Sequence, residues 1–477
     1  MSVPSWVQDA VFYQIFPDRF ANGDPANDPA DVQPWGSPPT NTGFQGGDLR
    51  GIADRLDYLT DLGVTAIWLN PIFAAGSNHR YNTADFRAID DRLGSDADFT
   101  RLVDEVHRRG MRLLLDGVFN HTGRGYFAFR DLLDRGEESA YRDWYHVRHF
   151  PLDAFGDEPA ENYLAWWNIR SLPKLNTDNP SVRAYLMDIA RRWIARGADG
   201  WRLDVPNEID DDSFWARFRR QVKSTNEEAY LLGEIWTVDP RWVGPRALDG
   251  LMNYPLRRSM LDLVVDGRLD AASFCREVET QVAAYPAENV LAQYNLLGSH
   301  DTERVATLAG GDARRVHLLM TLQFTLPGAP AIYYGDEIGL AGDKDPACRG
   351  AFPWGPAAWD SARRAWVRHL IEVRRDRPEL RRGSLRFFEI EGAESIVAFE
   401  RSVGPEASIV LANVAGDRLM VTLPRAALAQ PALGNLQDLL HGRTFESGEA
   451  GWNLSFEPFE AMLLAGASIQ RQPPGAA

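Results

Sequence analysis

Eight short apolar segments alternate with amphipathic segments along most of the chain, and this order restricts the possible folds more than any other feature. Strand-like segments that alternate with helical patterns are typical of βα units around a parallel sheet. The expected strands span residues 11–16, 64–70, 112–119, 200–205, 230–236, 251–254, 292–298 and 329–334. The expected helices span residues 49–62, 96–109, 181–196, 212–224, 271–284, 312–326 and 359–375. These units predict an α/β fold, a (β/α)8 TIM barrel rather than an open sheet.

Two stretches interrupt this alternation and predict further domains. The third and fourth expected strands lie far apart, which predicts an inserted subdomain at residues 122–178 within a barrel formed by residues 1–121 and 179–382. Alternating apolar residues without long helices predict a C-terminal antiparallel β-sandwich domain at 383–469. The last residues, 470–477, contain Pro-Pro-Gly and are expected to form a loose tail.

Charge and cysteine content exclude several classes of function. The chain has 51 Lys and Arg against 67 Asp and Glu, and a net charge of −16 disfavours nucleic acid as a partner. Cys275 and Cys348 are too few for a disulfide framework, so we expect free thiols. The first residues lack a signal-peptide pattern, and no window is long and apolar enough for a membrane span. We therefore expect a cytoplasmic protein without membrane contact.

Charged residues stand at the ends of four expected strands. They are Asp116 with His121, Arg202 with Asp204, Glu234, and His300 with Asp301. The carboxyl ends of barrel strands meet at one mouth, where the active sites of such barrels lie. A structural salt-bridge cluster could explain any one of these strand ends, because buried charges are costly unless they are paired. Four of them at one mouth favour an active site.

Several carboxylates at one mouth suit the hydrolysis of a glycosidic bond. A retaining mechanism needs one ionised carboxylate as nucleophile and one protonated carboxyl group as acid and then base. Asp204 is the expected nucleophile, because nearby Arg202 should hold its pKa down. Glu234, which precedes Ile235 and Trp236, is the better candidate for the protonated acid. Asp301 can stabilise the positive charge that develops on the sugar.

Five segments resemble motifs of the alpha-amylase superfamily, glycoside hydrolase family 13. They are DGVFNH (116–121), LPKLN (172–176), GWRLDVPNE (200–208), LLGEIW (231–236) and NLLGSHDTER (295–304). The resemblance covers nearly the whole chain and implies Asp204 as nucleophile, Glu234 as general acid/base and Asp301 as transition-state stabiliser. It implies substrate contacts from His79, Tyr81, His121, Arg202, Glu208, Trp236, His300 and Arg304.

Within that superfamily, LPKLN and VPNE resemble the neopullulanase, cyclomaltodextrinase and maltogenic amylase group. Two features differ from that group. Thr237 stands where the group usually has His. The group usually carries an N-terminal β domain that supports a dimer, whereas here the first expected strand already begins near Val11. We therefore expect a monomer that prefers short maltodextrins and cyclodextrins to starch.

A loop near the N-terminus carries many oxygen-bearing residues that suit Ca²⁺. The spacing does not fit an EF-hand, but it resembles the calcium loop of the neopullulanase-like group. That resemblance implies Asn22, Asp24, Asn27, Asp28, Gly46 and Asp48 as ligands of a structural ion. The alternative is an Asx-rich turn without a metal.

These observations predict a retaining hydrolase that cleaves α-1,4-glucosidic bonds in maltooligosaccharides, cyclodextrins, pullulan or starch, with α-1,6 bonds as further candidates. No Gly-rich loop predicts a nucleotide, and no organic cofactor is expected. Two alternatives stay open. The first is a transglycosylase or isomerase of the same superfamily, related to sucrose or trehalose. The second is a non-catalytic, transporter-associated homologue, although such proteins have a membrane anchor and incomplete catalytic residues.

Overall fold

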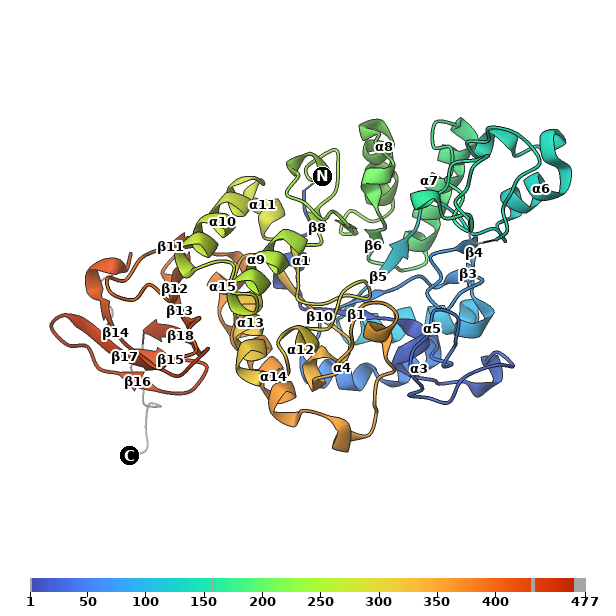
Figure 1. Cartoon of the computed structure of the whole chain (residues 1–477). Helices are drawn as coiled ribbons and strands as arrows, with labels where there is room; N and C mark the ends of the chain where they lie inside the picture. The colour runs from blue at the N-terminus through green and yellow to red at the C-terminus, as the bar shows by residue number, and fades with distance from the viewer. Residues whose placement is uncertain (1, 157, 430–433, 467–477) are drawn as a thin grey trace, which may run out of the picture. The chain divides into compact units, whose positions relative to one another are not determined.

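Eight parallel strands form a closed barrel in this protein, and a computed structural model describes residues 2–156, 158–429 and 434–466 (Figure 1). The predicted tail, 470–477, lies outside the described residues. The barrel strands are β1 (Phe12–Ile15), β2 (Ala66–Leu69), β5 (Arg112–Gly117), β6 (Gly200–Leu203), β7 (Tyr230–Gly233), β8 (Gly250–Leu251), β9 (Tyr294–Leu296) and β10 (Ala329–Tyr333). They pair in the order β8-β7-β6-β5-β2-β1-β10-β9, and a parallel bridge between Met252 and Tyr294 joins the two ends. The predicted (β/α)8 barrel is confirmed.

Helices follow most strands along the chain. The longer ones are α3 (Leu49–Asp54), α4 (Leu56–Leu62), α5 (Asp96–Arg108), α6 (Phe127–Arg135), α7 (Pro180–Ala195), α8 (Asp212–Thr225), α9 (Tyr254–Val264), α10 (Ala271–Ala283), α13 (Ala313–Thr325), α14 (Ser361–Asp376) and α15 (Pro378–Arg382). Single-turn helices are α1 (Trp6–Asp9), α2 (Pro17–Phe20), α11 (Ala287–Val290) and α12 (Val305–Leu308), and a hairpin pairs β3 (Phe73–Ala75) with β4 (Thr83–Ile89). None of the helices in the described ranges combines the length and apolar composition that crossing a bilayer requires.

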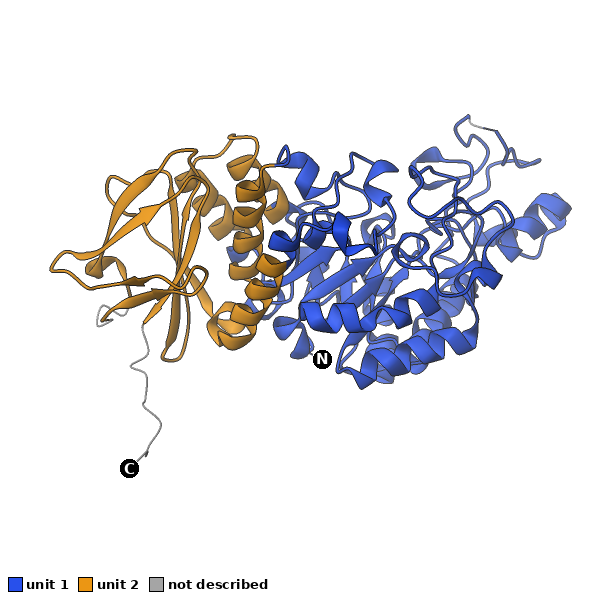
Figure 2. Ribbon diagram, turned by 90° about the horizontal axis from the view of Figure 1, so that it is seen from below, with its two compact units in different colours: residues 1–255, 282–311, 328–364 blue, residues 256–281, 312–327, 365–477 orange. Residues whose placement is uncertain are grey.

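The chain divides into two compact units (Figure 2). Unit 1 comprises residues 1–255, 282–311 and 328–364 and contains the eight barrel strands. Unit 2 comprises residues 256–281, 312–327 and 365–477. The predicted domain boundaries, including the insertion at 122–178, stay predictions.

Unit 2 contains the predicted C-terminal antiparallel β structure. Its larger sheet has the order β11-β12-β13-β18-β15-β16, and β14 pairs with β17. The strands are β11 (Ser384–Phe387), β12 (Ile396–Val403), β13 (Glu406–Asn413), β14 (Leu419–Pro424), β15 (Leu436–Asp438), β16 (Thr444–Phe445), β17 (Gly451–Phe456) and β18 (Ala461–Gly466). Leu411, Trp452 and Met462 belong to one apolar core to which both sheets contribute. The two sheets therefore pack around a common apolar interior.

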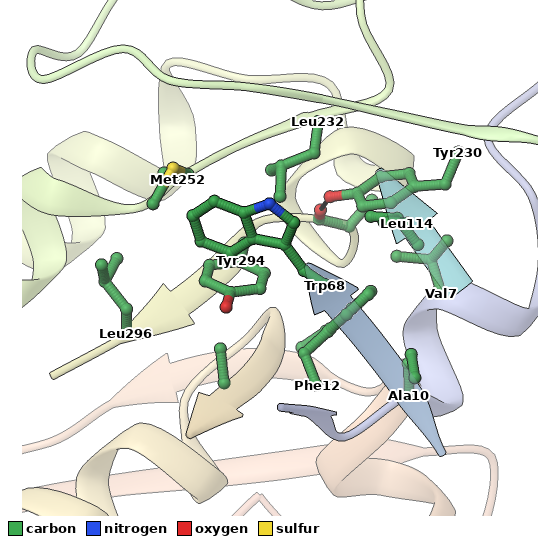
Figure 3. Close-up of a cluster of buried hydrophobic side chains, with 14 of the residues drawn as sticks. Val7, Ala10, Phe12, Trp68, Leu114, Tyr230, Leu232, Met252, Tyr294 and Leu296 are labelled. Atoms are coloured by element: carbon green, nitrogen blue, oxygen red, sulfur yellow. Dashed lines mark hydrogen bonds between the residues drawn. The ribbon is translucent and has the colours of Figure 1, made fainter. Parts of the chain in front are cut away.

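Apolar side chains fill the interior of the barrel because every second residue of a strand points inward. Phe12, Trp68, Leu114, Tyr230 and Leu232 belong to this buried core, and Figure 3 shows them around the indole of Trp68. The same alternation continues toward the carboxyl ends of the strands. Inward positions there change from apolar to polar, in the pairs Phe12 and Gln14, Trp68 and Asn70, Leu114 and Asp116, and Leu232 and Glu234. The barrel interior is therefore apolar, and the carboxyl ends of its strands carry polar side chains.

Gly250 lets strand β8 close the barrel. A Cβ atom at this position would lie 2.0 Å from Ala292 O and 2.5 Å from the hydroxyl oxygen of Tyr230. We expect Gly250→Ala to lower the free energy of unfolding by about 1–3 kcal/mol, because backbone atoms must move apart. Gly355→Ala is the control, since its Cβ would meet nothing within 4 Å. Urea unfolding measures both, and equal stability of the two variants would contradict this account of barrel closure.

Candidate active site

The guanidinium of Arg202, on β6, contacts three carboxylates at the barrel mouth. Its Nη1 lies 2.9 Å from Asp204 Oδ1 and 3.0 Å from Asp116 Oδ1, and its Nη2 lies 2.8 Å from Glu234 Oε2. The side chain of Arg202 is fully buried, with Cζ 5.0 Å from the ring centroid of Trp68. One cation therefore holds side chains from three neighbouring strands close together.

Glu234 is held through both of its carboxylate oxygens. The Val205 N–H donates to Oε2 at 3.1 Å, and Trp236 Nε1 donates to Oε1 at 3.1 Å. Val205 has φ 34° and ψ 55°, a left-handed conformation that is costly for a β-branched residue. The indole of Trp236 in turn stacks on the ring of Tyr254, with centroids 3.6 Å apart and planes at 10°. Local strain and stacking thus fix the orientation of this carboxyl group.

Burial changes the protonation of the carboxyl groups at the mouth. Burial and the Glu234 carboxylate raise the pKa of Asp301 to about 7, against the opposing charge of Arg349. Burial also raises the pKa of Asp116 to about 6, although Arg202 lowers it. Such carboxyl groups titrate together, so the mouth retains protons at a pH where exposed acids are ionised. A reaction that needs a protonated carboxyl group near neutral pH can therefore find one here.

The prediction of a lowered pKa for Asp204 is wrong, because its pKa is raised although Arg202 lies beside it. The guanidinium does lower the pKa, through the contact of 2.9 Å. Burial raises the pKa of Asp204 more strongly, and the neighbouring Glu234 and Asp116 carboxylates add to the rise. The net shift of this pKa is therefore upward, because burial and two neighbouring carboxylates outweigh the guanidinium.

Three histidines of the predicted set line the mouth in their neutral form. Burial lowers the pKa of His79 and of His121 to about 3, and it lowers the pKa of His300 well below its usual value. Gln14 Nε2 donates to His300 Nδ1 at 3.0 Å, which places the proton of that ring on Nε2, 3.3 Å from Asp301 Oδ2. Neutral rings donate and accept hydrogen bonds without adding charge, which suits contacts with sugar hydroxyl groups.

Tyr81 connects this wall to the carboxylates. Its hydroxyl donates to Asp116 Oδ2 at 2.9 Å, and its ring stacks on His300, with centroids 5.2 Å apart and planes at 4°. The ring of His79 stacks on the ring of Tyr81, with centroids 6.0 Å apart and planes at 23°. Arg80, between the two, has φ 61°. The segment therefore presents two aromatic faces beside the acids.

Glu208 and Arg304 have different surroundings from the other predicted substrate contacts. Glu208 lies at the edge of the mouth, where its Oε2 is 3.2 Å from Lys174 Nζ. Arg304 is fully buried, and its guanidinium donates to the carbonyl oxygens of Tyr334 and Cys348 and to Asp336 Oδ1. The structure therefore shows the guanidinium of Arg304 bound to three acceptors of the protein itself, and its contact with a substrate stays a prediction.

Several residues at the mouth are absent from the predicted set. Gln14 and Asn70 follow buried strand residues, and the rule that found Asp116 and Glu234 applies equally to them. Arg349 comes from a loop without a sequence signal, and its Nη2 lies 3.5 Å from Asp301 Oδ1.

The six residues of the predicted calcium loop come together in the structure. Asp28 receives hydrogen bonds from Asn22 Nδ2, and a Cβ at Gly46 would lie 2.3 Å from Asp28 Oδ1. Asn27 Oδ1 is buried and accepts no hydrogen bond, and Asn27 Nδ2 lies 3.3 Å from Asp48 Oδ2. No metal-binding group of three or more His, Cys, Asp or Glu occurs among the described residues, so an ion here would depend on amide and backbone oxygens as well. Such a ligand set fits Ca²⁺.

Two of these six residues also bind groups outside the loop's own set. Asp48 caps α3 by accepting the Gly51 N–H at 2.6 Å, and it also accepts the Asp24 N–H at 2.8 Å. The carboxylate of Asp24 pairs with Arg50 at 2.7 Å. Among the described residues, Asn27 Oδ1 accepts no hydrogen bond and Asp28 is bound only within the set, so these two residues are the best placed to bind an ion.

Comparisons with known proteins identify the family of this chain. The family model described as alpha amylase, catalytic domain, matches residues 14–378. Neopullulanase 2 of Thermoactinomyces vulgaris is 41% identical over 465 residues, which are 97% of this chain and 78% of that protein. A cyclomaltodextrinase of Geobacillus thermopakistaniensis is 42% identical over 464 residues, with the same two coverages.

Solved structures agree with these matches. The cyclic alpha-maltosyl-(1→6)-maltose hydrolase of Arthrobacter globiformis, in complex with cyclic alpha-maltosyl-(1→6)-maltose, superposes with a TM-score of 0.89 at 39% identity. The match covers 98% of this chain and 100% of that one. The matched segments include Asp116, Arg202, Asp204, Glu234 and Asp301.

Proposed function

The chain belongs to the alpha-amylase family of glycoside hydrolases, and from that premise we propose that it cleaves α-glucosidic bonds through a covalent glycosyl-enzyme on Asp204. One observation carries the proposal: Arg202 contacts Asp204 at 2.9 Å and Glu234 at 2.8 Å. Two carboxyl groups on one guanidinium lie close to each other. Retaining glycosidases keep theirs about 5–5.5 Å apart, whereas inverting ones need a wider gap for water.

In the proposed mechanism the Asp204 carboxylate attacks the anomeric carbon while Glu234 gives its proton to the glycosidic oxygen, which leaves as a hydroxyl group. Glu234 then takes a proton from water, and the water oxygen displaces Asp204 from the anomeric carbon. The hydrogen bonds from Val205 and Trp236 keep Glu234 oriented during both proton transfers. Asp301 stabilises the positive charge on the sugar, and the neutral rings of His121 and His300 bind its hydroxyl groups.

The proposed substrates are α-1,4-linked maltooligosaccharides and cyclodextrins, with pullulan and starch as poorer substrates and α-1,6 bonds as a second target. The names of the relatives support this class, because they include a neopullulanase, a cyclomaltodextrinase and a hydrolase of a cyclic α-1,6-containing maltose. Trp166 and Trp167 lie in the segment between β5 and β6 and supply aromatic surface on which glucose rings can pack.

Two experiments test the proposal. The purified protein is incubated with maltotriose, starch, pullulan, β-cyclodextrin and sucrose, and the products are identified. Maltose and glucose are expected as main products, with higher kcat/KM on maltotetraose and β-cyclodextrin than on starch per glycosidic bond. Products longer than the substrate would indicate a transglycosylase instead. In a separate measurement, NMR is expected to show the α-anomer first, and an initial β-anomer would exclude a covalent intermediate on Asp204.

We propose that the loop of Asn22, Asp24, Asn27, Asp28, Gly46 and Asp48 holds one structural Ca²⁺. Chelation with EDTA is expected to lower Tm by several degrees, and added Ca²⁺ is expected to restore it, because an ion that binds only the folded state stabilises that state. Asp28→Asn should abolish this response. Asp31→Asn is the control, since this neighbouring acid is exposed and outside the loop's contacts. A melting temperature insensitive to both EDTA and Ca²⁺ would overturn the proposal.

We further propose a monomer in the cytoplasm. The two cysteines, Cys275 and Cys348, are both free thiols, which suits a reducing compartment. Size-exclusion chromatography with light scattering measures the oligomeric state, and cell fractionation the location. A stable dimer at low micromolar concentration would contradict the first of these two proposals.

A further inference from the structure

Trp167 exposes an indole on a strained backbone. Trp167 is 76% exposed, which places it among the most exposed large apolar residues of the described chain. Trp167 has φ 47° and Asn168 has φ 59°, so two consecutive residues other than glycine adopt the left-handed conformation. Such conformations cost free energy and persist where the surrounding structure enforces them, often at functional sites. Neither the exposure nor the strain helps the fold.

The strain is concentrated around the candidate active site. The described residues include five with positive φ that are not glycine, and two of them, Arg80 and Val205, adjoin Tyr81 and Asp204. Trp167 and Asn168 are two more. Their segment connects β5 to β6, the strands that carry Asp116 and Arg202. Four of these five residues thus belong to segments that form the mouth or adjoin it.

A stack of three rings connects Trp167 to the mouth. The ring of His121 lies parallel to that of Trp166, with centroids 5.5 Å apart and planes at 22°. The indole of Trp166 lies parallel to that of Trp167, with centroids 4.5 Å apart and planes at 10°. Because Trp166 covers one face of the last indole, the large exposed area of Trp167 includes its opposite face. That open face is parallel to the ring of His121 at the mouth.

Backbone hydrogen bonds hold this turn on both sides. Within it, the Asn168 N–H donates to Ala165 O at 3.1 Å and the Ile169 N–H donates to Trp166 O at 2.9 Å. From outside, the Ala160 N–H donates to Asn168 O at 2.8 Å. These bonds hold the backbone of Trp167, and stacking on Trp166 holds its indole, before any ligand binds, which lowers the entropic cost of binding.

We propose that Trp167 is a sugar-stacking platform that binds a glucose ring of the substrate beyond the ring held at Asp204 and Glu234, and so selects longer or cyclic α-glucans. This inference rests on the proposed function. A pyranose ring has an apolar face of C–H groups that packs on a flat aromatic ring, and indole offers the largest such ring among side chains. A glucan that extends from the mouth along the stack meets the open face of Trp167. A short substrate does not reach it.

The kinetic test compares substrates of two sizes in Trp167→Ala. We expect kcat/KM for maltoheptaose and β-cyclodextrin to fall about tenfold more than kcat/KM for 4-nitrophenyl α-glucoside, with most of the loss in KM. Trp167→Phe should recover part of the loss, because it keeps an aromatic face. Phe155→Ala is the matched control: Phe155 is 66% exposed in the same inter-strand segment but is not part of the ring stack, and both substrates should be unaffected. Equal losses on both substrates, or no loss, would overturn the platform.

A binding measurement separates this inference from the proposed catalytic function. Maltoheptaose is titrated calorimetrically into Asp204→Asn and into the same variant carrying Trp167→Ala, and the second Kd is expected to be about tenfold higher. Failure of the wild type to cleave any glucan would refute the proposed function, whereas an unchanged Kd would refute the platform. Trp167→Gly adds a structural readout: glycine accepts positive φ, so Tm should not fall although binding weakens. A large fall in Tm with Kd unchanged would assign Trp167 a structural role instead.

Discussion

Asp204→Asn, Glu234→Gln and Asp301→Asn are each expected to lower kcat by about three orders of magnitude or more, because each removes an interaction that strengthens in the transition state. The fold should survive all three changes. Asp204 and Glu234 are buried and Asp301 is partly exposed, but each lies beside another acid, and a neutral amide of nearly the same shape relieves that repulsion. Thermal unfolding should therefore show Tm unchanged or higher than in the wild type. Steady-state kinetics on maltotriose and calorimetry measure the two effects.

The control for these variants is Asp210→Asn, an exposed acid that pairs with Arg241 and should change neither kcat nor Tm. Retention of more than about a tenth of the wild-type kcat in one variant would remove that residue from its assigned role. Azide distinguishes the nucleophile from the acid. In Asp204→Ala it should attack the α-glucoside directly and give a β-glucosyl azide, whereas in Glu234→Ala it should intercept the covalent intermediate and give the α-glucosyl azide.

The barrel strands could be predicted because burial and alternation are local properties. All eight expected strands occur, but each ends earlier than expected. Residues 200–205 form a strand only as far as Leu203, since Asp204 turns into the mouth and Val205 takes φ 34°. The residues that do the proposed chemistry thus follow the strands, where the regular pattern ends.

The helices show where local patterns mislead. The single helix expected at 49–62 is two helices, α3 and α4, because the backbone of Arg55 leaves the helical region at φ −107° and ψ 6°. No proline or glycine at that position indicates the break. Helix α9 begins at Tyr254, a residue assigned to the end of the sixth expected strand. Its start depends on the turn after β8, which tertiary packing determines.

The site was predictable as far as it consists of strand ends. Barrel closure brings Asp204, Glu234 and Asp301 to one mouth, because they follow the carboxyl ends of β6, β7 and β9. Arg349 could not be found in this way, because it reaches Asp301 from a loop whose path depends on the whole fold. The pKa of Asp204 could not be predicted either. Spacing identifies a nearby guanidinium, but only the structure shows that burial outweighs it.

Arg202→Met is expected to abolish activity and to destabilise the protein by about 3–5 kcal/mol near pH 8, because it leaves buried carboxylates without their cation. The loss should shrink toward pH 5. Arg202 lowers the pKa of both Asp116 and Asp204, so its removal raises these pKa values further above those of the unfolded chain. The folded variant then binds more protons than the unfolded chain at intermediate pH, and its stability declines as pH rises.

Urea unfolding of Arg202→Met and wild type at pH 5 and pH 8 measures this linkage. The control is Arg87→Met, which removes an exposed ion pair with Asp188 and should cost about 0–1 kcal/mol at either pH. Arg202→Lys keeps a charge but cannot span Asp204 and Glu234 with two nitrogen atoms, so it should recover stability at pH 8 more than activity. A loss of stability that is equal at both pH values would mean that Arg202 acts mainly by filling space beside Trp68. In that case the protonation of the mouth would not depend on the shared cation.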